Sequence, residues 1–436
     1  MPILRTAIFG LLLVATHLLS GCTLFEVKGQ QEKVGAVCRL HGTVKPDQPG
    51  EGEYVVVLLR HKGGEIGQRV NWSLVDHFLL EQPGAWFFVA NPGTYYLTAF
   101  QDVNRDQVFE RDEPAIPVDF KQVFACAPGE ARNDANLVIP HDGRIAGEGS
   151  VDISALQVRS AGEQLDASLG QALALGETTT LDNPRFSREN ASKGLWRPFD
   201  FIWDAKPGIY FLEPYTPAKT AVLFVHGING GPTDFRPLIE RLDRSRFQPW
   251  VYYYPSGAKL QNLGMYLDRL VMQLKARYGF KRLLLVAHSM GGLVARSALL
   301  DHAENYGDGL IPLFVSIATP WDGHRAAQLG VDYAPTAVYS WIDMAPGSAF
   351  LKGLYYQASG AERRRLPPSL DHHLIFTFLT TESGDGTVSL ESQLREEAQE
   401  ESKHLYGFAR SHMGVFDDPK TAVLLNRLLV EASGKP

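Results

Sequence analysis

The stretch Val286-Ala287-His288-Ser289-Met290-Gly291-Gly292 decides how the second half of this chain can fold. It overlaps the end of a strand-like apolar run at residues 282–287 and precedes a helix-prone run at residues 293–300. A serine on a sharp strand-to-helix turn needs small residues two positions before and after it, because larger side chains there would clash. Ala287 and Gly291 meet this requirement, although glycine is commoner at the first position. The stretch therefore predicts a turn that exposes the Ser289 hydroxyl.

The sequence around this turn alternates between strands and helices. From residue 209 onward, apolar runs alternate with amphipathic segments, a pattern typical of a largely parallel sheet covered by helices. Between residues 260 and 274, apolar residues recur at helical spacing and predict a helix that packs one stripe on the sheet. The expected strands are residues 220–225, 249–254, 282–287, 313–318 and 374–380.

A second motif supports the first. Val225-His226-Gly227-Ile228-Asn229-Gly230-Gly231 ends the first of these strands, and its glycines let the backbone approach a substrate. The two motifs together resemble the α/β-hydrolase superfamily, especially bacterial lipases and inositol-deacylase-like serine esterases. The resemblance covers about residues 209–430 and implies an α/β-hydrolase fold with a mostly parallel, doubly wound sheet. It also implies an oxyanion hole formed by the amides of Ile228 and Met290.

The catalytic acid of this superfamily follows the serine in the chain. Asp385 lies between two glycines directly after the last expected strand, which resembles the acid loop of lipases. The alternative is a tight turn in which Asp385 caps its own backbone. Poorer candidates for the acid are Asp322 and Asp343, and Glu382 could substitute for Asp385.

Only two histidines, His404 and His412, lie beyond Asp385. His404 begins a strand-like run, whereas His412 lies in a loop before a final helix expected at residues 420–432. Because a catalytic base belongs in such a loop, His412 is the better candidate. Ser289 would then be the nucleophile, His412 its base, and Asp385 the group that orients the imidazole.

Two further segments bear on the substrate. Thr319-Pro320-Trp321-Asp322-Gly323-His324 resembles a loop of lipases that lies beside the active site, although it could be a plain turn. Residues 330–373 form a long insertion rich in aromatic residues, and long loops are usually functional or disordered. We interpret the insertion as a lid over an acyl pocket. The alternative is an insertion with a purely structural role.

The first part of the chain has a different composition. Residues 33–140 contain runs rich in β-branched and aromatic residues, separated by glycine and proline, and predict a small β-sandwich. Residues 141–205 lack clear periodicity and are interpreted as a connector to a hydrolase domain at residues 206–436.

One acidic loop of the β-sandwich has oxygen ligands at calcium-loop spacing. These residues are Asp102, Asn104, Asp106 and Glu113. Gln107 stands where the sharp turn of such a loop needs glycine, so a solvated acidic turn is the alternative to a structural calcium site. No cofactor is expected to be required for catalysis.

The N-terminus predicts export. An apolar run at residues 7–19 is too short to span a bilayer but suits a signal peptide. Leu19-Ser20-Gly21-Cys22 resembles the lipobox of bacterial lipoproteins, which implies cleavage after residue 21, acylation of Cys22 and a tether at residues 22–32. The alternative is an ordinary signal peptide with a chance cysteine. Thr23 favours the outer membrane, facing the periplasm, if the source is Gram-negative.

The remaining cysteines are Cys38 and Cys126. They form either a disulfide, since an exported chain meets an oxidising compartment, or two buried thiols.

Composition excludes several classes of function. The 436 residues predict two or three domains, and the 44% hydrophobic and 21% charged residues are typical of soluble globular chains. The net charge of −7 and the lack of a basic stripe make nucleic acid an unsuitable partner. The sequence therefore predicts a membrane-anchored serine hydrolase that acts on carboxylic esters through an acyl-enzyme, and the expected esters are those of lipids. The alternatives are an acyltransferase with the same triad and a non-catalytic binding lipoprotein, and protein partners are not predicted.

Overall fold

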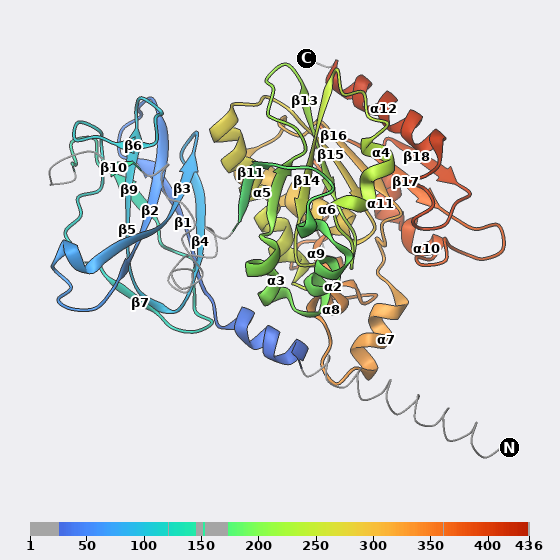
Figure 1. Cartoon of the computed structure of the whole chain (residues 1–436), viewed down its shortest axis with the longest axis horizontal. Coiled ribbons are helices and arrows are strands. Elements are labelled where there is room, and N and C mark those ends of the chain that lie inside the picture. Colours follow the sequence, from blue (N-terminus) through green and yellow to red (C-terminus); the bar gives the residue numbers. More distant parts are fainter. Residues whose placement is uncertain (1–25, 121, 145–150, 153–172, 361, 435–436) are drawn as a thin grey trace.

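The computed structural model describes residues 26–120, 122–144, 151–152, 173–360 and 362–434. The expected signal peptide at residues 1–21 and Cys22 lie outside these residues, so both stay predictions. The described chain forms a β domain and a larger α/β domain that lie side by side (Figure 1). Within the described residues, no helix is both long and apolar enough to cross a bilayer.

The α/β domain is built on one sheet of eight strands in the order β11-β12-β14-β13-β15-β16-β17-β18. All neighbouring strands are parallel except β12 and β14, which confirms the mostly parallel sheet. The strands are β11 (Ala174–Thr178), β12 (Gly208–Phe211), β13 (Thr220–Val225), β14 (Phe247–Tyr253), β15 (Leu283–His288), β16 (Leu313–Ile317), β17 (Asp371–Thr377) and β18 (His404–Phe408). The last of the five expected strands begins three residues earlier than predicted, at Asp371 rather than at residue 374.

Helices cover both faces of this sheet (Figure 1). Leu223 and Val225 of β13 face the core beneath α5 and α6, whereas Val222 and Phe224 face the core beneath α12. This alternation is the period of two that a strand buried on both sides requires. The helices are α2 (Arg188–Trp196), α3 (Pro198–Ala205), α4 (Arg236–Ile239), α5 (Leu260–Tyr278), α6 (Met290–Tyr306), α7 (Arg325–Tyr333), α8 (Tyr339–Met344), α9 (Ala349–Gly353), α10 (Leu390–Gln393), α11 (Glu396–Glu400) and α12 (Pro419–Ser433).

The β domain is a sandwich, as its composition predicted. In one sheet β1 is central, with β4 on one side and β8 and β9 on the other, and the second sheet has the order β3-β2-β5-β7. Side chains from both sheets, such as Trp86, Phe88, Val56 and Tyr95, share one core. The strands are β1 (Cys38–Pro46), β2 (Glu53–His61), β3 (Trp72–Leu80), β4 (Gly84–Ala90), β5 (Gly93–Asp102), β6 (Val108–Phe109), β7 (Phe124–Cys126), β8 (Ala131–Arg132), β9 (Leu137–Ile139) and β10 (Val151–Asp152).

Of the expected connector at residues 141–205, the described residues 173–205 belong to the α/β domain. Strand β11 lies at the edge of the eight-stranded sheet, and Phe201 of α3 is buried in that domain's core. The hydrolase sheet therefore begins at Ala174 rather than after residue 206. Sequence periodicity missed β11 because an edge strand of five residues has too little apolar repetition to be distinguished from a loop.

The expected tether at residues 22–32 is also ordered in its described part. Residues 26–35 form a helix whose Val27 and Gln30 are buried. The Gln30 side-chain oxygen accepts hydrogen bonds from the amides of Phe199 and Asp200 at 3.1 Å each. The segment between the first described residue and the β domain is therefore docked on the α/β domain.

The two domains are joined by an extensive contact. Phe87 of the sandwich packs against Tyr266 of α5 with ring centroids 5.2 Å apart. Arg269 of α5 and Tyr306 of α6 both donate to the carbonyl of Ala85, at 3.3 and 3.2 Å. Apolar and hydrogen-bonded contacts together fix how the sandwich sits on these helices.

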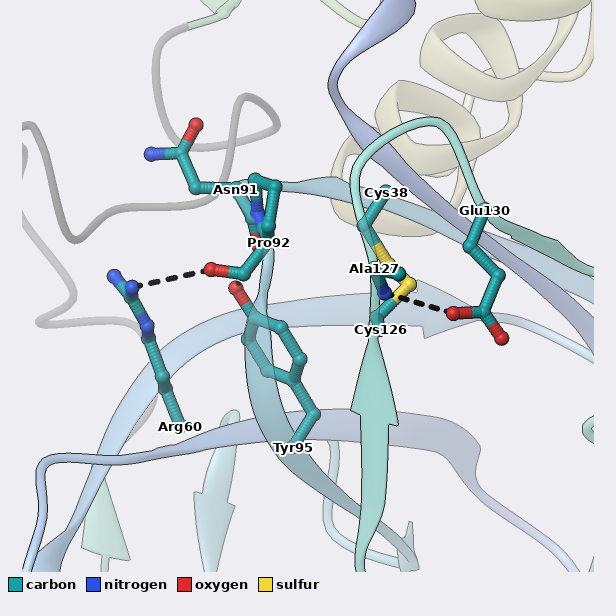
Figure 2. The surroundings of a disulfide bond; sticks show 8 residues. All are labelled: Cys38, Arg60, Asn91, Pro92, Tyr95, Cys126, Ala127 and Glu130. Atoms are coloured by element: carbon teal, nitrogen blue, oxygen red, sulfur yellow. Dashed lines mark hydrogen bonds between the residues drawn. A yellow bond between two sulfur atoms is a disulfide. The ribbon is translucent and has the colours of Figure 1, made fainter.

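A disulfide between Cys38 and Cys126 confirms the pairing that the cysteine count suggested. Cys38 begins β1 of one sheet and Cys126 ends β7 of the other, so the bond joins the two sheets of the sandwich (Figure 2). Both residues are buried, and beside them the amide of Ala127 donates to Glu130 at 2.7 Å.

Removing this bond should destabilise the sandwich. The cysteines are 88 residues apart, and in the chain-entropy model a bridge of that span stabilises the fold by about 4.6 kcal/mol. We expect the double variant Cys38→Ser/Cys126→Ser to unfold at a lower urea concentration, followed by circular dichroism. Cys22→Ser is the matched control and should leave the transition in place. An unchanged transition in the double variant would show that the bond does not constrain the unfolded chain.

Candidate active site

The structure places Ser289 at a sharp turn between β15 and α6. Its backbone has a φ of 54° and a ψ of −132°, a conformation that residues other than glycine rarely adopt. Its amide donates to the carbonyl of Ile317 on the neighbouring strand at 2.8 Å, and its hydroxyl makes no capping bond to the helix. The hydroxyl is thus available at the end of the strand, as the sequence around it predicted.

Close backbone contacts explain the small residues around this turn. A Cβ added to Gly291 would lie 2.4 Å from the carbonyl oxygens of Val225 and His226. A Cβ added to Gly227 would lie 2.9 Å from the Cβ of Ser289. The turn and the loop after β13 are therefore packed so closely that a side chain at Gly291 or Gly227 would clash.

Asp385 and His412 come together as an acid and base pair. The ring nitrogen Nδ1 of His412 lies 2.8 Å from Oδ2 of Asp385, and Asp385 is 1% exposed. Because the carboxylate accepts this hydrogen bond, Nδ1 carries the proton and Nε2 is left as the basic nitrogen. The His412 amide also donates to the carbonyl of Asp385 at 3.0 Å, which holds the two loops together.

The surroundings of Asp385 keep its carboxylate ionised. Burial by itself would raise its pKa, but the hydrogen bond and charge of His412, the Thr377 hydroxyl and the Val388 amide together lower the pKa below its usual value of 3.8. The hydroxyl is 2.6 Å and the amide 2.7 Å from the carboxylate oxygens. Gln393, whose Nε2 lies 3.3 Å from Oδ2, completes this set of donors.

The other acids considered from the sequence lie elsewhere. Asp322 faces Arg395 at 3.1 Å, and Asp343 accepts from the amide of Leu260 at 2.7 Å. Glu382 is exposed. The structure thus brings Asp385 to His412 and leaves these three carboxylates with other partners or in solvent.

The remaining histidines near the site have structural positions. His404 begins β18 and is exposed. His288 is buried, and its Nε2 donates to the backbone carbonyl of His412 at 3.1 Å. Burial and the neighbouring His412 ring lower the pKa of His288 well below its usual value, so it stays neutral. His288 therefore holds the His412 loop in place through this hydrogen bond.

The loop after β13 faces Ser289. Asn229 has a φ of 53°, and its amide donates to the Ser256 hydroxyl at 3.0 Å. Within the part of the chain that the structure describes, the amides of Ile228 and Met290 have no hydrogen-bond acceptor. Met290 is the first residue of α6, where helix geometry leaves the amide unpaired.

A cavity of about 350 Å³ contains both Ser289 and His412. Its walls are mostly apolar, and its charged pair, Arg188 and Asp234, is joined at 3.3 Å. The other lining residues are Gly227, Ile228, Asn229, Gly230, His288, Pro320, His324, Ala326, Ala327, Trp341, Met344, Thr387 and Met413.

The insertion expected to be a lid has two different roles. Trp341 and Met344 of α8 line the cavity, as a lid requires. Leu351, Leu354 and Tyr355 are instead buried in the main core of the domain. Among the described residues of 330–373, Trp341 and Met344 therefore line the cavity, and α7, which begins at residue 325, adds Ala326 and Ala327 to its lining.

The acidic loop of the β domain is organised by its own backbone. Asp102 is fully buried and accepts from the amides of Arg105 and Gln107 at 2.7 and 2.8 Å. Glu113 accepts from the amide of Val103 at 2.8 Å. Among the described residues, no group of three or more histidine, cysteine or acidic side chains is arranged to hold a metal ion. The calcium site suggested for Asp102, Asn104, Asp106 and Glu113 stays a prediction.

Sequence reasoning missed the donors behind the acid. Thr377 ends β17 and Gln393 ends α10, and neither carries a recognisable motif. Gln393 is fully buried. Its Oε1 accepts from the Thr377 amide at 2.8 Å, and its Nε2 donates to the Thr377 carbonyl at 2.9 Å. A buried glutamine is detectable only once its neighbours are known, so no signal in the sequence marked it.

The lowered pKa of Asp385 predicts a pH-dependent stability. The unfolded carboxyl binds its proton at a higher pH than the folded one, so acidification favours unfolding. The stabilisation by Asp385 is present above the usual value of 3.8 and is lost as the pH falls through the lower folded pKa. We expect Asp385→Asn to destabilise the chain more near neutral pH than at about pH 3.5, measured by urea unfolding. Asp322→Asn is the control, and an equal loss at both pH values for Asp385→Asn would contradict the argument.

Comparisons with known proteins agree with the fold. Residues 251–355 match the model of the PGAP1-like alpha/beta domain. No curated protein matches the chain.

Solved structures with a similar fold are each matched over about half of this chain. They include the lin2722 gene product of Listeria innocua (16% identity, 48% of this chain, 94% of that chain, TM-score 0.38), the mature lipase BlEst2 of Bacillus licheniformis (16%, 50%, 97%, 0.40) and the esterase Pf2001 of Pyrococcus furiosus (19%, 50%, 84%, 0.35). At these TM-scores the similarities carry no functional conclusion. The order of the sheet and the turn at Ser289 give this chain an α/β-hydrolase fold, and residues 251–355 are similar to the PGAP1-like alpha/beta domain.

Proposed function

We propose that the chain is a membrane-anchored serine hydrolase that cleaves carboxylic esters of lipids through an acyl-enzyme intermediate. One observation carries the proposal. Ser289, at a φ of 54°, shares a cavity with His412, and His412 is bonded at 2.8 Å to the buried Asp385. A hydroxyl is a weak nucleophile until a base removes its proton, and this arrangement supplies both the base and the group that orients it.

The chemistry follows from these positions. The Ser289 oxygen attacks the ester carbonyl carbon while Nε2 of His412 takes the hydroxyl proton. The amides of Ile228 and Met290 donate to the oxyanion. The carbon–oxygen bond to the alcohol then breaks, and His412 returns the proton to the leaving alcohol. A water molecule attacks the acyl-serine in the same way, which releases the carboxylic acid and the free hydroxyl.

The cavity suits an uncharged acyl group. Ile228, Trp341, Met344 and Met413 give it an apolar lining, and burying an acyl chain there would be favourable at about 25 cal/mol per Å². The charges of Arg188 and Asp234 compensate each other at 3.3 Å. These features support a lipid ester as the substrate.

The sequence before the described residues supports anchoring. Acylation of Cys22 would add about 0.8 kcal/mol of membrane affinity per buried CH₂, so several chains would hold the protein stably. We propose that the mature chain begins at Cys22 and lies on the periplasmic face of an outer membrane in a Gram-negative source.

Substitutions in the triad test the proposed hydrolase. We expect Ser289→Ala to abolish labelling by a fluorophosphonate and to lower turnover of a short-chain ester by about 10⁴-fold or more. His412→Ala should cost about as much, because the serine loses its base. Turnover is measured by release of free carboxylic acid, so an acyltransferase would be recognised by transfer of the acyl group to an added alcohol.

The matched control is His404→Ala. Because His404 is exposed at the start of β18, its loss should change turnover by no more than about twofold. If the His404 variant were inactive while the His412 variant kept its activity, the assignment of the base would be wrong. An unlabelled parent chain would instead identify an inert binding lipoprotein.

Changing Cys22 tests the anchor independently of catalysis. We expect Cys22→Ser to move the protein from the membrane fraction to the soluble fraction, because the thiol that carries the acyl chains is gone. Turnover of a soluble ester should stay the same, since the site lies in the α/β domain. If the variant stayed with membranes after a high-salt wash, something other than the lipid would hold it there.

A further inference from the structure

The helix at residues 26–35 packs against the wall of the site cavity. Val27 is 2% exposed and lies in a small apolar cluster against which Ile228 and Trp341 pack. Both of these residues also line the cavity that contains Ser289. One layer of side chains therefore separates the first described helix from the candidate active site.

Hydrogen bonds fix the direction of this helix. Gln30, 5% exposed, accepts from the first amides of α3 at 3.1 Å each. Gln31 donates to the carbonyl of Ala337, in the segment between α7 and α8, at 2.7 Å. Figure 1 shows this helix, in blue, below the α/β domain on the side of α7 and α8. A flexible tether would make none of these contacts.

Covalent geometry then limits where the anchor can be. Cys22 is five residues before Val27, and an extended chain advances at most about 3.6 Å per residue. The Cα atom of Cys22 thus lies within about 18 Å of the Cα atom of Val27. An acyl group on Cys22 must enter the bilayer close to the cavity.

Exposed apolar side chains gather on the same side. Of the large hydrophobic residues that are exposed in the described chain, Leu329 (57%) and Tyr333 (80%) lie one turn apart on α7. Ile342 (44%) lies on α8, and Met413 (42%) lines the cavity. We call these four residues the apolar rim.

Helices α7 and α8 hold the rim together. A Cβ added to Gly330 of α7 would lie 2.4 Å from the ring of Trp341 on α8, so the two helices touch at this point. Gly330 and Trp341 are the direct neighbours of Leu329 and Ile342. Single exposed apolar residues are ordinary, but a group of them beside a cavity marks an interaction surface.

We propose that the docked helix and the apolar rim seat the mouth of the cavity on the bilayer that carries the Cys22 anchor. The partner is a phospholipid bilayer, and the substrate is an acyl ester embedded in that same bilayer. The inference rests on the proposed anchor and extends the proposed hydrolase by fixing its orientation. The anchor explains membrane attachment, and the helix explains why the site faces the membrane.

Depth-dependent quenching tests the orientation without using catalysis. The full-length acylated chain is reconstituted in vesicles of phosphatidylethanolamine and phosphatidylglycerol as Tyr333→Cys or as Val423→Cys, each labelled with bimane. The positions are matched, because Tyr333 is 80% and Val423, on α12, is 70% exposed. Cys38 and Cys126 are paired and Cys22 is acylated, so the new thiol is the one that reacts. We expect doxyl lipids to quench the label at position 333 at least threefold more than the label at position 423.

A linker variant separates the helix from the anchor. A twenty-residue Gly-Ser insertion between Phe25 and Glu26 leaves the docked helix intact but lets the anchor move away from it. The quenching at position 333 should then fall, as should hydrolysis of a long-chain ester in the same vesicles. The same insertion between Gly63 and Gly64, in the β domain, is the control and should change neither. Both linker variants should hydrolyse a soluble short-chain ester at the parent rate.

The outcomes distinguish this inference from the proposals it rests on. Equal quenching at positions 333 and 423, or quenching that the linker does not change, would overturn the orientation while the anchor stands. A chain that does not float with the vesicles would remove the anchor and the orientation together. If the parent chain did not hydrolyse a soluble ester, the proposed hydrolase activity would be wrong, and the quenching result would remain valid.

Discussion

The turn at Ser289 is the constraint on which the rest of the α/β domain depends. A residue other than glycine at a φ of 54° costs of the order of 1–3 kcal/mol and persists only where its surroundings leave it no alternative. Here the Ser289 amide is bonded to Ile317 on β16 at 2.8 Å, and Gly291 lies against the carbonyls that end β13. Two flanking strands thus hold the turn, and the helix that follows leaves the Met290 amide unpaired.

Parallel strands explain why distant residues meet at this turn. Ser289 follows β15, Asp385 follows β17 and His412 follows β18, and these strands lie in the order β15-β16-β17-β18. Because the strands are parallel, their carboxyl ends share one edge of the sheet, where ligands of open α/β sheets bind. The buried donors around Asp385 then keep its carboxylate ionised and its partner imidazole in one tautomer.

Two regions outside the eight-stranded sheet pack against the α/β domain. The sandwich packs on α5 and α6, and its two sheets are joined by the disulfide between Cys38 and Cys126. The helix at residues 26–35 docks on α3 and on the segment before α8 instead of acting as a loose tether. The described chain from residue 26 to the β domain is therefore held against the α/β domain.

The sequence by itself determined the local features of the site. The small residues around Ser289, the glycine-rich loop after residue 225 and the loop position of His412 each reflect a steric or chemical requirement that adjacent residues express directly. For the same reason the strands β13 and β16, buried on both faces, were found within one residue. The cysteine count indicated the disulfide but left two buried thiols as the alternative.

The tertiary structure alone decided the features that depend on distant contacts. Strand β11 became part of the sheet by pairing with β12, and Gln393 became a donor to Asp385 only by packing beneath it. The helix at residues 26–35 is docked through Gln30, whose side chain accepts from the first amides of α3. The Asp102 carboxylate accepts from backbone amides of its own loop. Such partners come from other elements or from a local backbone shape, and neither residue type nor periodicity records them.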